Sequence, residues 1–503
     1  MSGKREFGDY QTPISFAEKV CLYLKEKKGI RPTAILEPTC GIGNFLKSSL
    51  IFGADEIVGI EINPEYCTLC QENVPDQGIR ILNENFFGMD TKKLFQNSQE
   101  CLIIGNPPWV TNSTLASMES TNVPQKKNFK GLKGMDAITG SSNFDICEYI
   151  ILQLIDEYRD TDTTLAMLCK TAVARNVFVE LKRNKINFYE CEIVEFNASK
   201  VFDISASACL LIIKLSKTKN SPDICNVRNF DDVDHVISKF GYKDGQLYSD
   251  ASFSSYNFDG TSCFEWRQGV KHDCSKVMEL TWNGKSFVNG RKELVYIEKD
   301  IVYPLIKSSM FKKPIINSFK KYVIVTQRKV KEPTDHLRLD VPRTWAYLQQ
   351  HLGDFQKRKS SIYTNAPDFS MFGVGDYSYS PYKVGVSGFY KQPLFSVLYS
   401  EDDVPVMTDD TGYFICFDQY DDAYVAMLLL NSAPVQAFLR SIAFLDAKRP
   451  YTKKILARLD FRKMVDTLTF ADLQRTEEQL KIEPYVTEAM YDAFLQIVCK
   501  RKS

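Results

Sequence analysis

The sequence predicts an α/β fold with a mostly parallel sheet and a ligand site at the carboxyl edge of that sheet. Three short apolar runs support this prediction, because each ends in a polar or glycine-bearing turn, at residues 37–43, at Glu61 and at Asn106. Short apolar runs that alternate with helix-length segments are typical of buried parallel strands. Polar residues that follow such strands converge at one edge of the sheet, where ligands bind in these folds.

The first run, residues 34–36, leads into a loop of residues 37–43, and a helix is expected to begin near Asn44. Gly41 and Gly43 permit a positive φ and let the backbone approach a ligand closely. The Asn44 side chain could cap the helix. A strand, a glycine-bearing loop and a helix in this order are typical of a nucleotide-binding turn.

The second run, residues 57–60, ends on Glu61, which follows the glycine loop by about 20 residues, the spacing at which doubly wound folds place an acid on ribose hydroxyls. A third run, residues 79–82, precedes Asn85 and Phe86. A polar side chain beside an aromatic ring at this strand end could hold an adenine moiety by its edge and its face. Phe86 could equally belong to the core.

The fourth run, residues 101–105, ends in Asn106-Pro107-Pro108-Trp109. Two prolines directly after a strand end it, because neither can donate a ladder hydrogen bond. An amide side chain, a stiffly held carbonyl and an indole at a strand end form a pocket for a flat, amine-bearing ring. Adenine flipped out of a helix is such a ring.

The N-terminal segment predicts a loop pinned by a packed helix. Thr12 could cap a helix whose first residue is Pro13, a favoured pairing. Apolar residues from Ala17 to Leu24 then recur at helical spacing on one face. Residues 10–13 would therefore form a loop able to close over a small molecule.

Together these motifs resemble those of DNA amino-methyltransferases that use S-adenosylmethionine. Residues 37–46 resemble the cofactor loop of that family, residues 106–109 its catalytic tetrapeptide, and residues 7–13 the extra cofactor motif of its gamma subclass. The order of the motifs is that of the gamma subclass. The resemblance implies a DNA adenine-N6 methyltransferase of the restriction–modification type.

The resemblance also implies a fold and a division of the chain. A Rossmann-like class I methyltransferase domain with a mostly parallel seven-stranded sheet is expected over residues 1–216. A C-terminal α+β target-recognition domain is expected over residues 223–503, after a polar linker. Within it, residues 372–377 loosely resemble recognition regions of related enzymes. Residues 110–142, which are rich in Gly, Ser and Lys, could order against DNA.

By this resemblance, the Asn106 side-chain oxygen and the Pro107 carbonyl accept hydrogen bonds from the target amino group. Trp109 stacks on the flipped base, and Phe202, just before an apolar strand, matches the aromatic residue on its other face, with Phe196 as the alternative. The expected cofactor-binding residues are Tyr10, Thr12, Pro13, Glu37, Thr39, Gly41, Gly43, Glu61, Asn85, Phe86 and Asn106. No metal is expected, because the four histidines show no ligand-like spacing.

Two positions depart from the family pattern. Position 109 is Trp, where Tyr or Phe is common in adenine enzymes, although all three rings can stack. Asn85 stands where many relatives have Asp, which puts adenine recognition by that residue in doubt. Neither departure removes the catalytic amide.

The composition indicates the cellular compartment and the kind of partner to expect. The 503 residues contain no signal peptide and no apolar run long enough to span a membrane, and the 14 cysteines are irregularly spaced. A cytoplasmic, bacterial protein with reduced cysteines is expected. The net charge is zero, yet residues 301–360 carry 13 Lys or Arg against 4 Asp or Glu. Such a basic stretch is typical of phosphate binding, so double-stranded DNA is the expected partner.

Several alternatives stay open at this point. A DNA cytosine-N4 methyltransferase acts on the same kind of amine, and RNA or protein amino-methyltransferases carry similar tetrapeptides. A fused nuclease is not expected, because few residues precede the extra motif; a separate cognate restriction endonuclease could act beside this protein. A binding protein with a dead site is disfavoured by the intact motifs at 37–43 and 106–109.

Overall fold

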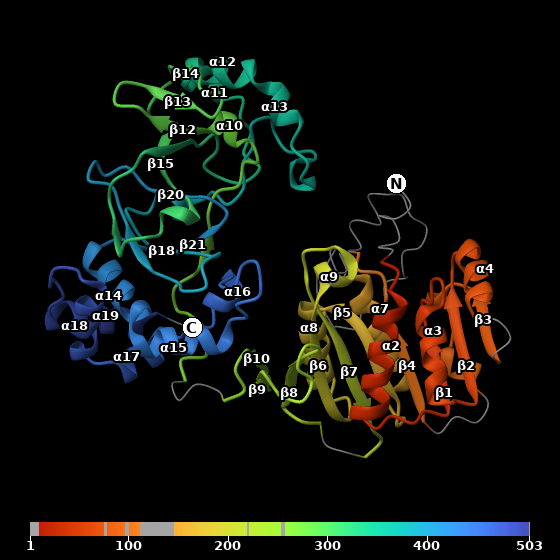
Figure 1. The fold of residues 1–503 in the computed structure, drawn as a ribbon. Helices are drawn as coiled ribbons and strands as arrows, with labels where there is room; N and C mark the ends of the chain where they lie inside the picture. The colour runs from red at the N-terminus through yellow and green to blue at the C-terminus, as the bar shows by residue number, and fades with distance from the viewer. Residues whose placement is uncertain are drawn as a thin grey trace. The chain divides into compact units, whose positions relative to one another are not determined.

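The chain divides into two compact units, residues 1–252 and residues 253–503. The structure, a computed structural model, describes residues 10–74, 78–95, 100–110, 145–218, 221–252 and 257–501. Each unit has its own sheets and its own buried core (Figure 1). The first unit contains all of the residues expected to bind the cofactor or the target base.

The first unit is built on a ten-stranded sheet in the order β10-β9-β8-β6-β7-β5-β4-β1-β2-β3. Its strands are β1 (Ala34–Glu37), β2 (Glu56–Glu61), β3 (Ile79–Asn83), β4 (Cys101–Gly105), β5 (Thr164–Lys170), β6 (Phe188–Asn197), β7 (Ser207–Leu215), β8 (Ile224–Asn229), β9 (Ser238–Lys243) and β10 (Gln246–Tyr248). Strands β3, β2, β1, β4 and β5 are parallel neighbours, and β7 runs antiparallel between β5 and β6. These seven strands form the mostly parallel sheet that the sequence predicts.

The sheet does not stop at seven strands. Strand β8 pairs parallel with β6, and β9 and β10 add antiparallel to it. The expected domain boundary after residue 216 therefore differs from the structure, in which the first unit extends to residue 252. The physical reason is the open edge of β6, whose unpaired backbone groups are satisfied by β8.

Helices pack against this sheet in the first unit (Figure 1). They are α2 (Ile14–Leu22), α3 (Asn44–Ser49), α4 (Pro64–Asn73), α7 (Ile146–Tyr158), α8 (Thr171–Arg183) and α9 (Ala198–Phe202), with short helical turns η1 (Tyr23–Lys27), η2 (Leu50–Phe52), η3 (Phe86–Gly88) and η4 (Thr91–Leu94). Helix α2 packs on α3, and α7 packs on α8. Asn63 caps α4 and Asp145 caps α7, each through its side-chain oxygen.

The expected cap at Thr12 is wrong. Helix α2 begins at Ile14, its N-cap is Pro13, and no side chain caps it. The Pro13 carbonyl accepts instead from the Phe16 and Ala17 amides at 2.9 and 3.0 Å. Thr12 is buried, and its backbone oxygen is bonded elsewhere, as the site below shows.

The second unit contains a five-stranded and a six-stranded sheet, in the orders β11-β21-β18-β19-β16 and β14-β13-β12-β17-β15-β20. The strands are β11 (Arg267–Gln268), β12 (Glu279–Trp282), β13 (Phe287–Asn289), β14 (Leu294–Val295), β15 (Val302–Ile306), β16 (Ile315–Ile316), β17 (Lys321–Ile324), β18 (Tyr382–Ser387), β19 (Ser396–Leu398), β20 (Met407–Thr408) and β21 (Gly412–Phe417). Mixed sheets and helices make this unit α+β, as the sequence predicts.

The helices of the second unit are α10 (Ser275–Met278), α11 (Leu337–Asp340), α12 (Pro342–Gln350), α13 (Leu352–Gln356), α14 (Tyr420–Asn431), α15 (Ala433–Ile442), α16 (Lys453–Leu456), α17 (Phe461–Thr467), α18 (Phe470–Leu480) and α19 (Glu488–Lys500), with turns η5 (Ser308–Met310), η6 (Ser361–Tyr363) and η7 (Asp376–Tyr379). Helix α14 is buried along nearly its whole length against β18, β19, β21, α18 and α19. It therefore joins the five-stranded sheet to the C-terminal helices.

Within the described residues, no single helix has the length and apolar character needed to cross a membrane. Helices α14 and α15 meet that requirement of length and composition only as a pair bent by 62°.

Candidate functional site

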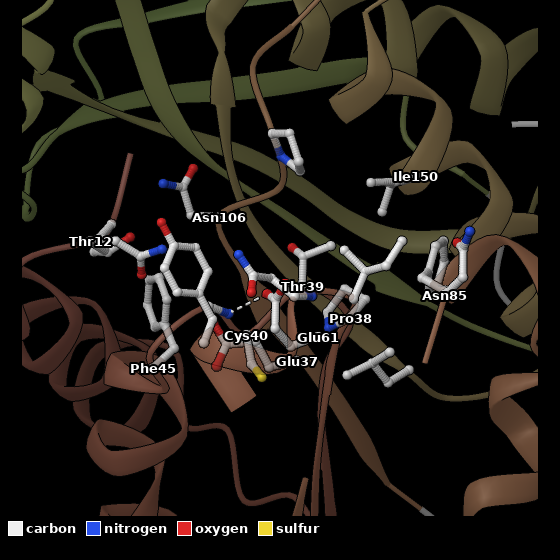
Figure 2. A pocket seen from close by; sticks show the side chains of 18 of the residues that line it. Thr12, Glu37, Pro38, Thr39, Cys40, Phe45, Glu61, Asn85, Asn106 and Ile150 are labelled. Atoms are coloured by element: carbon white, nitrogen blue, oxygen red, sulfur yellow. Dashed lines mark hydrogen bonds between the residues drawn. The ribbon is translucent and has the colours of Figure 1, made fainter. Parts of the chain in front are cut away.

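A pocket lies at the carboxyl end of the sheet in the first unit, lined by residues that follow four strands. Glu37 ends β1, Glu61 ends β2, Asn85 follows β3, and Asn106 follows β4. In Figure 2, Asn106 lies toward one end of the pocket and Asn85 toward the other, with Glu61 between them. The sequence therefore predicted correctly that these strand ends meet, because they are neighbours in a parallel sheet.

The loop between β1 and α3 uses both glycines in left-handed conformations. Gly41 has φ +53° and Gly43 has φ +82°. A Cβ on Gly41 would lie 2.5 Å from Gln11 Oε1, and one on Gly43 would lie 2.4 Å from Cys70 Sγ. Gly41 lines the pocket, whereas Gly43 packs away from it against helix α4.

Gly43 allows a measurement of how much this close packing matters. Replacing Gly43 with alanine is expected to lower the free energy of unfolding by about 1–2 kcal/mol for the left-handed φ and by about 1–3 kcal/mol more for the collision with Cys70. Gly53→Ala is the matched control, because Gly53 has φ +68° with nothing within 4 Å. Calorimetric unfolding of both variants should show the larger loss at Gly43; equal losses would mean that the collision relaxes without cost.

Asn44 does not cap helix α3 as expected, because it is the first residue of the helix and Gly43 is the N-cap. Its Nδ2 atom donates to the Thr12 carbonyl at 2.8 Å, and its Oδ1 atom accepts from Asn73 at 3.0 Å. Asn44 therefore holds residues 10–13 against the glycine loop. Gln11 does the same, since its Oε1 atom accepts from the Ile42 amide at 3.3 Å.

Glu61 binds the backbone on both sides of the pocket. Its Oε2 atom accepts from the Gly41 amide at 2.9 Å, and its Oε1 atom accepts from the Asn63 amide at 2.8 Å. Its side chain lies in the pocket wall and is only 9% exposed. A carboxylate held rigidly in the pocket wall after a parallel strand lies where doubly wound folds bind the hydroxyl groups of a ligand.

Glu37 and Thr39 lie deeper in the same wall. Burial raises the pKa of the Glu37 carboxyl well above its usual value, and its Oε2 atom accepts from the Leu46 amide at 3.2 Å. Within the described part of the chain, the buried Thr39 hydroxyl has no hydrogen-bond partner. A buried hydroxyl that is unsatisfied in a pocket wall is suited to bonding a ligand, since leaving it unmade costs free energy.

Asn85 and Phe86 both line the pocket, and Asn85 lies at the end opposite Asn106 (Figure 2). Asn85 caps the turn η3, because its Oδ1 atom accepts from the Phe87 amide at 3.0 Å. Phe86 is 4% exposed and also lines the pocket. Phe86 is therefore buried and is also part of the pocket wall, which is compatible with both interpretations of this residue.

Asn106 is held by one end of its amide. Its Nδ2 atom donates to the Tyr10 carbonyl at 2.9 Å. Its Oδ1 atom is buried and accepts no hydrogen bond from any described residue. Pro107 follows it and is buried, so the backbone of the turn is rigid. The turn therefore presents a fixed, unused acceptor at one end of the pocket.

Three aromatic rings stand together beside Asn106. The Trp109 and Phe202 ring centroids lie 5.5 Å apart, and the Tyr10 ring lies 6.2 Å from each. Trp109 is buried and its Nε1 donates to the Leu168 carbonyl at 3.4 Å, whereas Phe202, at the end of α9, is half-buried. Phe196 is instead packed into the core at 4.8 Å from Phe16. Phe202 is therefore the better placed of the two candidates.

Lys170 supports the turn at residues 106–109, and no sequence pattern singled it out. It ends β5, and its Nζ donates to the Trp109 carbonyl at 3.2 Å and to Asp145 Oδ2 at 2.7 Å. Asp145 in turn caps helix α7, whose residues Ile146 and Ile150 line the pocket. The sequence around Lys170 does not reveal this role, because its partners Trp109 and Asp145 lie in distant segments of the chain.

Of the residues expected to bind the cofactor, all but Pro13 and Gly43 line this pocket. The pocket residues that the sequence did not single out include Asn63 and Tyr66. Asn63 was open to prediction, since an Asn before Pro64 is a standard helix start. Residues 7–9 of the extra motif and most of the segment 110–142 lie outside the described residues.

Comparison with known proteins finds relatives among methyltransferases. M.NspV of Nostoc sp., a type II methyltransferase, is 39% identical over 467 residues, which cover 91% of this chain and 96% of that protein. The modification methylase CviBIII of Paramecium bursaria Chlorella virus NC1A is 24% identical over 216 residues, 42% of this chain and 51% of that protein. No family model matches the chain.

A solved structure resembles the whole chain in fold. The type IIL restriction-modification enzyme MmeI, solved in complex with DNA, matches 98% of this chain and 75% of its own with a TM-score of 0.52 and 12% identity. The expectation of a Rossmann-like class I methyltransferase domain with a further α+β domain is thereby confirmed.

The pocket also fits the cofactor of such enzymes. A rigid carboxylate at Glu61, an unsatisfied hydroxyl at Thr39 and a polar and aromatic pair at Asn85 and Phe86 suit a ribose, its substituents and an adenine ring. S-adenosylmethionine is accordingly the cofactor. With a relative of 39% identity aligned over 96% of its length, this chain belongs to the type II DNA methyltransferases of restriction–modification systems.

Proposed function

We propose that this enzyme methylates the N6 amino group of an adenine flipped out of double-stranded DNA. The observation that supports the proposal best is the Asn106 amide, whose nitrogen is bonded to Tyr10 while its buried oxygen accepts nothing from the described residues. The amide at position 106 and the order of the motifs favour adenine over cytosine-N4, since both are features of the adenine group that the chain resembles.

The adenine amino group is a poor nucleophile, because its lone pair is delocalised into the ring. The Asn106 Oδ1 atom and the Pro107 carbonyl would accept the two amino protons. Two acceptors held in fixed positions draw the nitrogen toward tetrahedral geometry and localise its lone pair. Their bonds strengthen as the nitrogen becomes positive, so they stabilise the transition state more than the ground state.

The aromatic rings would hold the flipped base. Trp109 and Phe202 stand 5.5 Å apart in an edge-to-face arrangement, with Phe202 half-buried at the end of the short helix α9. A base can stack on Trp109 and be bounded by Phe202 if α9 yields slightly. Lys170 fixes the backbone of Trp109, so the base would be held against a rigid wall.

The remaining pocket residues would orient the cofactor, which supplies an electrophilic methyl group on a sulfonium centre. Glu61 would bind the ribose hydroxyls, and Asn85 with Phe86 would bind the adenine moiety at the far end of the pocket. In this orientation the methionine end would lie nearest Asn106, which is at the opposite end of the pocket from Asn85 (Figure 2). Tyr10, Thr12 and Pro13 would cover that end.

The second unit, residues 253–503, would recognise the DNA sequence around the target adenine. Its excess of basic residues between 301 and 360 supports this role, because duplex DNA is polyanionic. A separate restriction endonuclease that cuts the same sequence would be its natural partner, since methylation at the target protects host DNA from such an enzyme.

The proposal is tested by nucleoside mass spectrometry of unmethylated plasmid incubated with the enzyme and S-adenosylmethionine. We expect N6-methyladenine. N4-methylcytosine would retain the site and its mechanism but overturn the choice of base. Methylation of RNA or protein in place of DNA would overturn the substrate class.

A further inference from the structure

The basic runs of the second unit are not equivalent, because many of their cations are used inside the fold. Arg358 donates to the Ser370 carbonyl at 2.6 Å and lies over the Tyr363 ring at 3.7 Å. Lys321 donates to Thr281 Oγ1 at 2.8 Å. These groups stabilise the unit itself and are poorly placed to bind an external ligand.

A different pattern occurs at residues 328–331, which we call the basic tip and which follow strand β17. Arg328, Lys329 and Lys331 are all exposed, as is Val330 between them. Among residues 257–501, no carboxylate forms an ion pair with any of the three cationic side chains. The tip therefore presents three exposed positive charges within four residues.

Hydrogen bonds hold the backbone of the basic tip in one conformation. The Glu332 carboxylate accepts from the Arg328 amide at 2.6 Å and from the Lys329 amide at 3.0 Å, and these bonds hold its pKa below the usual value. Gln327 is 2% exposed and donates through Nε2 to the Glu332 carbonyl. Lys331 has φ +68°, a left-handed turn conformation that is uncommon for lysine.

The support of the tip continues into a glycine-rich segment that precedes η7. Gln327 Oε1 accepts from the Met371 amide at 2.8 Å, and Thr326 Oγ1 donates to the Phe369 carbonyl at 2.7 Å. The Arg328 guanidinium lies over the Tyr379 ring, 4.9 Å from its centroid. The basic tip therefore contacts η7, which overlaps the end of the segment 372–377 that loosely resembles recognition regions.

We propose that the basic tip is a contact of this enzyme with the phosphate backbone of duplex DNA. Because hydrogen bonds already hold the backbone of this turn, its backbone loses little conformational entropy when the three cations bind a ligand. The Glu332 carboxylate, the buried Gln327 amide and the left-handed Lys331 hold this turn, and the three cationic side chains on it stay exposed. The inference rests on the proposed role of the second unit in binding DNA.

The test compares two full-length variants with the same change of charge. The first replaces Arg328, Lys329 and Lys331 with glutamine. The control replaces Lys312, Lys313 and Lys320 with glutamine; these three lysines are exposed in the same unit. Binding of a fluorescein-labelled duplex of random sequence is measured over a series of salt concentrations, and thermal unfolding verifies that both variants are folded.

The logarithm of the DNA association constant falls linearly with the logarithm of the salt concentration, and each phosphate contact contributes about 0.9 to the steepness of that fall. The tip variant is expected to reduce the steepness by about 2–3 and to weaken binding about 10-fold or more. The control is expected to change both much less. An unchanged slope in the tip variant, or an equal change in the control, would overturn the inference. Nucleoside mass spectrometry of the wild-type reaction tests the proposed function separately, so the two failures are distinguishable.

Discussion

Asn106→Ala is expected to lower the rate of methyl transfer by about 10²–10³-fold or more, the cost of removing one preorganised hydrogen-bond partner from a reacting centre. The amide oxygen is buried and unused by the described residues, so its only role in this pocket would be toward the substrate. Because that role is exercised in the transition state, affinity for S-adenosylmethionine should change little.

Single-turnover methylation and cofactor titration measure the two effects separately. Asn184→Ala serves as the control, because Asn184 is exposed at the end of helix α8, away from the pocket. It should retain the wild-type rate. A rate for Asn106→Ala within a few fold of wild type would show that the amide does not activate the target nitrogen. Loss of cofactor binding would instead indicate that its bond to Tyr10 serves mainly to hold the pocket closed.

Glu61→Ala is expected to weaken S-adenosylmethionine binding by roughly 100-fold, or about 3 kcal/mol, from the loss of charge-assisted hydrogen bonds to two hydroxyl groups. The substitution also leaves the Gly41 and Asn63 amides without their acceptor, which loosens the glycine loop. The dissociation constant should therefore rise far more than the rate at saturating cofactor falls.

Isothermal titration calorimetry with S-adenosylmethionine measures this change. Glu65→Gln is the control, since Glu65 lies at the start of helix α4 close in sequence to Glu61 but does not line the pocket. It should bind the cofactor as wild type does. Wild-type affinity in Glu61→Ala would contradict the ribose-binding role and would leave Glu61 as a purely structural brace of the loop.

Much of the first unit could be predicted because its signals are local. Each of the runs before Glu37, Glu61 and Asn106 is short, apolar and followed by a polar turn, and each is a buried strand in the structure. Chain direction and strand adjacency then bring their ends together without further information. Gly41 and Gly43 were predictable for the same reason, since a loop between strand and helix needs positive φ values.

Other features depend on partners far away in the chain. Asn44 and Thr12 were both expected to cap helices, yet they bond to each other, because the packing of α2 on α3 brings these segments together. Lys170 is joined to the catalytic turn only by folding. The continuation of the sheet through β8, β9 and β10 likewise depends on the free edge of β6. The sequence does not reveal it, because the polar segment before β8 is typical of a linker between domains.

The basic residues of the second unit show the same division. Composition was enough to place an excess of positive charge between residues 301 and 360. The tertiary structure decides which of those charges are exposed. Arg358 bonds to backbone carbonyls, whereas the basic tip at residues 328–331 is exposed on a turn that Glu332 stabilises. Local patterns specify strands, turns and total charge; long-range packing specifies which polar groups are satisfied within the fold and which remain for a ligand.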